Sequence, residues 1–117
     1  MLSFPRTVRV FACAEPTDMR CGADRLSAQV QQALGYSVLA GDLFLFVSRN
    51  RHRAKIVYWD GTGLCLFAKR LAKGVFAAPW QGSRHKPWCL TMTELQLFLE
   101  GSRLIGQVAV SPPAYTP

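Results

Sequence analysis

The stretch LFLFVSRNRHRAKIVYWDGTGLCLFAK, residues 43–69, decides the fold. Its three apolar runs, which predict strands, are residues 43–48, 54–59 and 64–69. A short basic loop separates the first two runs, and the turn dipeptide Asp60-Gly61 lies between the second and the third. Because short connections join antiparallel neighbours, the stretch predicts an antiparallel meander at the centre of the protein.

The flanks of this stretch predict further elements. Residues 6–12 alternate in polarity and predict a strand, whereas residues 22–34 carry apolar side chains at helical spacing before Gly35, which ends the helix. Lys73-Gly74 indicates another turn, and residues 75–77 predict a short final strand.

A second helix is predicted near the C-terminus, after a loop at residues 81–88. Thr91 and Glu94 have the spacing of a capping box, in which each side chain accepts a bond from an otherwise unpaired N–H. Leu95, Phe98 and Leu99 supply the buried face of this helix, and Gly101 ends it. The segment after it contains Pro112, Pro113 and Pro117.

These patterns predict an α+β fold: one domain over residues 1–105, with a mostly antiparallel sheet of four or five strands and two main helices. Residues 106–117 form a Pro-containing irregular tail in this interpretation. The run at 43–47 is apolar on both faces, while two short helices are expected to cover only one face of the sheet. We therefore expect a second copy to bury the other face, giving a homo-oligomer.

The charge balance indicates a polyanionic partner. Fourteen Lys and Arg residues stand against seven Asp and Glu, giving +7 and a pI near 9.8. Such an excess favours DNA binding, although it also serves solubility. No apolar run approaches the ~20 residues that span a bilayer. Since the N-terminus also lacks a secretory signal, we expect a cytoplasmic protein that is not associated with a membrane.

Two basic clusters are the candidate DNA-contact residues. The primary cluster consists of Arg49, Arg51, Arg53 and Lys55, with His52 among them, and the secondary cluster of Lys69, Arg70 and Lys73. The guanidinium fork suits phosphate, and the first cluster would lie on a hairpin tip. The alternative for the first cluster is a solvated loop. The second is expected near the other end of the neighbouring strands, where a merely charged strand end is an equally good interpretation.

The candidate catalytic acids each have a local structural explanation. They are Asp18, Asp42, Asp60 and Glu94. Turn, cap and helix-dipole roles account for Asp60, Glu94 and Asp18, and Asp42 follows Gly41 at a strand entry. Since no nucleophile or phosphate-loop motif is present either, the sequence favours a protein that is not an enzyme. The four cysteines show no C-x-x-C spacing and the histidines stand apart from them, so we expect reduced thiols, no metal and no cofactor.

The run Lys55–Leu71 resembles the central signature of TnpB, the second-reading-frame accessory protein of the insertion-sequence-66 transposon family. Residues 17–20 match its N-terminal motif, and residues 49–53 its arginine-rich stretch. The motif residues carried over are Asp18, Met19, Arg20, Trp59, Asp60 and Gly61. The sequence departs from the family at residues 21–23 and after Leu104.

The resemblance implies a process rather than a mechanism. TnpB-like proteins are encoded beside a larger transposase and assist transposition, so the partners implied are DNA, at the transposon ends, and a separate transposase subunit. The resemblance supplies no catalytic residues. One alternative is a protein-interaction module that docks on the transposase without binding DNA. A second is a nuclease with a cryptic metal site, which metal-dependent DNA cleavage would reveal.

Overall fold

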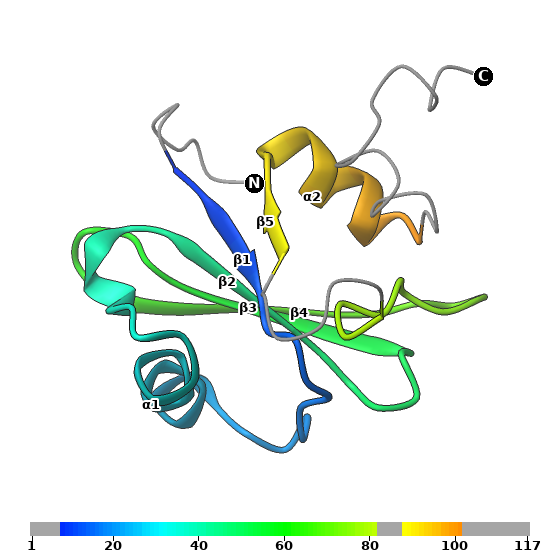
Figure 1. Cartoon of the computed structure of the whole chain (residues 1–117), viewed down its shortest axis with the longest axis horizontal. Helices are drawn as coiled ribbons and strands as arrows, with labels where there is room; N and C mark the ends of the chain where they lie inside the picture. The colour runs from blue at the N-terminus through cyan, green and yellow to red at the C-terminus, as the bar shows by residue number, and fades with distance from the viewer. Residues whose placement is uncertain (1–7, 82–87, 102–117) are drawn as a thin grey trace.

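The structure is a computed structural model that describes residues 8–81 and 88–101. In chain order the elements are β1 (Val10–Ala12), α1 (Ala23–Leu34), the 3-10 turn η1 (Val38–Ala40), β2 (Leu43–Val47), β3 (Arg53–Trp59), β4 (Leu64–Arg70), β5 (Trp88–Leu90) and α2 (Met92–Leu99) (Figure 1). The predicted α+β fold with two main helices is confirmed.

The sheet has five strands in the order β4-β3-β2-β1-β5. The predicted meander is confirmed, because β2, β3 and β4 pair antiparallel in sequence order. β1 instead pairs parallel with β2, since α1 and η1 form the crossover between them, and β5 returns antiparallel to β1. The sheet is therefore mixed but mostly antiparallel.

The prediction of a strand at residues 75–77 is wrong. Within the described chain these residues have no sheet neighbour. The Phe76 amide donates to the carbonyl of Arg51 at 2.8 Å, and its side chain is fully buried. The segment is therefore a connection that is hydrogen-bonded to the basic loop and packs its Phe76 side chain into the core. The fifth strand is β5, which the sequence assigned in part to a loop because a three-residue strand shows no periodicity.

The two helices cover opposite faces of the sheet, as Figure 1 shows. Leu26 and Val30 of α1 pack with Phe44 and Phe46, whereas Leu95 and Phe98 of α2 belong to the core on the other face. Every residue of β2 is buried. The expectation that one apolar face is left for a second copy is therefore wrong, because the chain covers both faces of its central strands itself.

A buried carboxylate ties the starts of β1 and β2 together. Asp42 accepts a bond from the backbone amide of Arg9 at 3.1 Å and another from its guanidinium at 3.0 Å. The Arg9 guanidinium also lies 5.1 Å from the centre of the Phe11 ring. The sequence suggested only a strand-entry position for Asp42, because its partner is 33 residues away.

The capping box of α2 is formed as predicted. The Thr91 hydroxyl accepts from the Glu94 amide at 3.1 Å, and the Thr91 amide donates to the Glu94 carboxylate at 2.8 Å. The Glu94 side chain is buried whereas Thr91 is exposed, so the two bonds lie at the boundary between core and solvent. This carboxylate is thereby used to start a helix, as the sequence indicated.

The Thr91→Ala variant should be less stable than the parent by about 1 kcal/mol, because the helix start loses its side-chain acceptor. Urea unfolding followed by circular dichroism measures this difference. Thr93→Ala is the matched control, since Thr93 is exposed within α2 and Ala is the better helix former. Equal losses in the two variants would contradict the capping assignment.

Candidate nucleic-acid interface

The loop between β2 and β3 is held in one shape by its own polar side chains. The Ser48 hydroxyl donates to the Asn50 side-chain oxygen at 2.8 Å and accepts from the Arg53 amide at 3.2 Å. The same Asn50 oxygen accepts from the His52 amide at 3.0 Å. Arg51 has a left-handed backbone with φ 65°, and its amide donates to the Ser48 carbonyl. The loop is thus a preorganised turn.

The chain that follows β4 braces this loop from a second side. The Leu71 amide donates to the His52 carbonyl at 3.0 Å, and the Phe76 amide donates to the Arg51 carbonyl at 2.8 Å. Two loop carbonyls are therefore fixed by backbone bonds to a distant segment. The exposed side chains of Arg49, His52 and Arg53 project from this support.

Antiparallel pairing brings the two predicted basic clusters to the same end of the sheet. Arg53 begins β3 and lies directly opposite Arg70, which ends β4. The expectation that the second cluster lies at the other end is wrong, because the last residue of one strand neighbours the first residue of its antiparallel partner. Like charges directly opposite each other destabilise a sheet, and no described carboxylate forms an ion pair with either arginine.

A groove of about 660 Å³ lies at this end of the sheet. Its polar lining residues are Ser48, Arg49, Asn50, His52, Arg53 and Arg70, and no carboxylate is among its lining residues. Met19 completes one wall. We call this site, defined by Arg49, Arg53 and Arg70 with their polar neighbours, the arginine groove. It offers guanidinium donors without a competing acid, which is the chemistry of an anion site.

The motif around Asp18 forms a tight turn beside the arginine groove. The Asp18 carboxylate accepts from the Arg20 amide at 2.9 Å and pairs with its guanidinium at 2.8 Å. These hydrogen bonds lower the pKa of Asp18 to about 2. Both side chains are largely solvent-facing, so the pair shapes the turn. The Thr17 amide fastens the segment to the sheet through the Val47 carbonyl, at 2.9 Å.

Lys55 holds the same motif turn on the sheet. Its Nζ donates to the carbonyl oxygens of Met19, at 2.7 Å, and Cys21, at 2.9 Å. The side chain is half-buried and its donors point into the protein. Lys55 therefore positions the turn that supplies Met19 to the groove. The sequence predicted that Lys55 contacts phosphate. That prediction missed the two carbonyl acceptors of Lys55, because they are more than thirty residues away in the chain.

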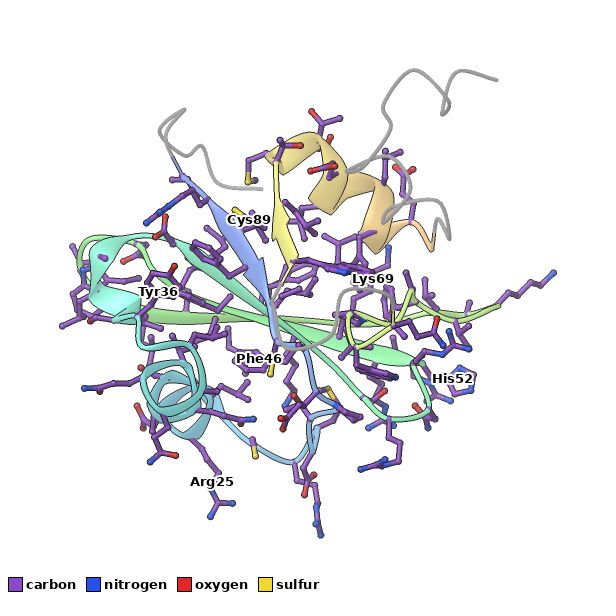
Figure 2. The ribbon with its side chains drawn as sticks, in the orientation of Figure 1. Arg25, Tyr36, Phe46, His52, Lys69 and Cys89 are labelled. Atoms are coloured by element: carbon purple, nitrogen blue, oxygen red, sulfur yellow. The ribbon has the colours of Figure 1, made fainter. Side chains whose placement is uncertain are left out.

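The other predicted basic residues lie outside the arginine groove. Lys69 is on the α2 side of the sheet (Figure 2), and its Nζ donates to the Leu99 carbonyl at 2.6 Å. A cation at a helix C-terminus is stabilised by the helix dipole, so this contact docks α2. Lys73 is exposed and Arg51 half-buried, and neither lines the groove. The structure thus gathers Arg49, Arg53 and Arg70.

The second half of the family motif lies at the opposite end of β3. Asp60 accepts from the amides of Thr62, at 2.9 Å, and Gly63, at 2.8 Å, and these bonds lower its pKa. Gly61 takes φ 104°, which favours glycine. Trp59 is half-buried against the core on the α1 side. These residues build a turn and its packing, whereas Asp18, Met19 and Arg20 adjoin the groove.

The described ranges, 8–81 and 88–101, contain His, Cys, Asp and Glu side chains spread along the chain. Within them, no three His, Cys, Asp or Glu side chains are grouped closely enough to hold a metal ion. Cys13, Cys21, Cys65 and Cys89 are free thiols. No helix in this part of the chain is long and apolar enough to cross a membrane.

The fold and groove define a small basic α+β protein with a braced arginine cluster. Residues 8–108 match the family described as "IS66 Orf2 like protein". The chain belongs to this family, whose members are accessory proteins of insertion-sequence transposition and are generally non-catalytic. The resemblance found in the sequence is thereby confirmed.

Two curated relatives come from Sinorhizobium fredii. The uncharacterized protein y4hO is 37% identical over 101 residues, which is 86% of each chain. The uncharacterized protein y4jC is 35% identical over 79 residues, or 68% of each chain. No solved structure matches this chain.

Replacing Lys55 by Met should destabilise the protein by about 1–3 kcal/mol, because two carbonyls would lose a charged donor. Lys73→Met is the control: this exposed side chain should change stability by under about 0.5 kcal/mol. Urea unfolding measures both differences. Limited proteolysis should also show faster cleavage near residues 17–21 in Lys55→Met alone. If Lys55→Met were as stable as Lys73→Met, the two hydrogen bonds of Lys55 would contribute nothing to the stability of the fold.

Proposed function

We propose that this protein is a DNA-binding accessory factor of transposition, and that the arginine groove binds the phosphate backbone. The observation that carries this proposal is the placement of Arg53 directly opposite Arg70, on a braced support and without an acid in the groove lining. Bound phosphate would relieve the repulsion between the two guanidiniums. Their planar forks can each donate two bonds to its oxygens.

Contacts of this kind give affinity without reading bases. Phosphate contacts fix the position of a protein on DNA, whereas sequence is read from base edges in the grooves. The net charge of +7 adds a general attraction to the duplex. In this proposal the protein works in the cytoplasm at transposon ends, and the separate transposase subunit selects the site and supplies the catalytic chemistry.

A second candidate function is docking on the transposase without direct DNA binding. Guanidinium forks match carboxylates as well as phosphates, so an acidic surface of the transposase would also fit the arginine groove. The two candidates differ in what competes for the groove: short duplex DNA in the first, and only the transposase in the second.

The double variant Arg53→Ala/Arg70→Ala should bind duplex DNA more weakly than the parent, and about equally so for element ends and unrelated sequences. The slope of log affinity against log salt should become shallower by roughly 1 per lost contact, or about 2 in total. Fluorescence anisotropy over a salt series, with the transposase absent, measures both quantities. The fold should persist, because both side chains are exposed.

Arg25→Glu is the charge-matched control, since it also removes two units of positive charge. Arg25 projects from α1, away from His52 at the loop tip (Figure 2). This variant should keep most of the salt slope. If the double variant bound DNA like the parent, the groove would not be the phosphate site. Loss of transposase binding in that same variant would then favour the docking function.

A further inference from the structure

The outer edge of β4 is the longest open strand edge in the part of the chain that the structure describes. β4 spans seven residues at one end of the sheet and is hydrogen-bonded only to β3. The strand at the other end, β5, has three residues. An open edge presents unpaired N–H and C=O groups in a row, and a short edge strand is one way in which proteins limit this exposure. β5 has that protection and β4 does not.

The first five residues of β4 also lack the side chains that discourage pairing. Residues 64–68 contain no charge and no proline, which are the usual blocks at sheet edges. Leu66 is 39% exposed and Phe67 36% exposed, and they are two of the four exposed large hydrophobic residues in the described ranges. As consecutive strand residues they lie on opposite faces of the sheet. A partner that covered both of these side chains would therefore have to contact the strand edge that lies between the two faces.

We propose that β4 pairs antiparallel with β4 of a second copy, forming a continuous ten-stranded sheet. A two-fold axis perpendicular to the sheet keeps corresponding faces of the two copies on the same side of the joint sheet. A residue of one copy can therefore lie opposite only a residue of the other copy that belongs to the same face. This requirement restricts the register to one centred on a residue, and the two registers centred on the exposed apolar residues place Leu66 opposite Leu66 or Phe67 opposite Phe67. In the first register Phe67 lies opposite Cys65 of the other copy, and in the second Leu66 lies opposite Ala68, so both exposed side chains meet apolar residues of the second copy.

The charges at the two ends of β4 favour this orientation and this partner. Lys69 and Arg70 end the strand, whereas the exposed acid Asp60 precedes its start. Antiparallel pairing sets the basic end of one copy toward the acidic end of the other. Parallel pairing would place Arg70 beside Arg70, which is unfavourable. The edge is therefore complementary to itself in one orientation.

The expected dimer is weak. A pair of seven-residue strands buries less than the roughly 1,600 Å² of a standard interface, so we expect dissociation in the micromolar range. The two-fold axis also leaves both arginine grooves on the same side of the joint sheet. Counted along the strands, their Arg70 residues lie about 20–27 Å apart. If the proposed function holds, one dimer can thus contact a single duplex at two places.

Sedimentation velocity without DNA, across the micromolar range, tests the pairing. We expect a monomer–dimer equilibrium in the parent, and a dimer roughly tenfold weaker or more in Phe67→Lys, because the substitution places two cations at or next to the two-fold axis in either register. Leu39→Lys is the control, since Leu39 is 66% exposed but lies in η1. It should dimerise like the parent. The variant Arg49→Ala/Arg53→Ala, which removes two groove arginines and leaves β4 intact, should also remain dimeric, and this separates the test from that of DNA binding.

Hydrogen exchange of the parent gives a second readout that needs no substitution. Amides on the open edge of β4 should become protected as concentration rises, while those of α1 should not change. A protein that stays monomeric throughout would overturn the proposal. So would a dimer that survives Phe67→Lys and leaves β4 exchange unchanged, or a monomer whose β4 is protected only when the transposase is added.

Discussion

The register of β3 is the constraint on which the rest of the structure depends. Side chains along a strand alternate between faces, so Ala54, Ile56 and Tyr58 enter the core on the α2 side, while Lys55, Val57 and Trp59 face the α1 side. A slip of one residue would move Lys55 to the apolar face now occupied by Ala54 and Ile56, where an unpaired charge is strongly unfavourable. The same register sets Arg53 against Arg70.

Lys55 links this register to the family motifs. It lies on the strand of the central signature and binds the carbonyls of Met19, in the N-terminal motif, and of Cys21, which directly follows that motif. Motifs far apart in the sequence are thus parts of one corner of the molecule. The turn at Asp60 serves the other end of the same strand, where its hydrogen bonds close the hairpin that returns β4 to the groove.

Much of the fold could be predicted because its signals are local. The meander, the helix ended by Gly35 and the capping box of α2 all depend on residues near one another in the chain. Three other features could not be predicted, because each depends on a partner that is distant in the sequence. They are the parallel pairing of β1, the presence of strand β5 and the burial of Phe76. The candidate site was likewise predicted only where its signals are local. The sequence identified Arg49 and Arg53 as one cluster, but Arg70 joins them only through the pairing of β3 with β4. The spacing of Ser48 and Asn50 was the one local signal of a braced loop that was missed.

The arginine groove carries an energetic cost that stability alone does not explain. Arg53 and Arg70 repel each other across the ladder, and Arg51 holds a left-handed backbone, which costs an ordinary residue roughly 1–2 kcal/mol. The bonds from Ser48, Asn50, Leu71 and Phe76 offset this cost and keep the loop from relaxing. Elsewhere in the described chain, Arg9, Arg20, Lys55 and Lys69 each have an oxygen partner within the protein. The chain satisfies those four cations internally, whereas no described acid pairs with Arg53 or Arg70, which is the charge arrangement that the proposed phosphate site requires.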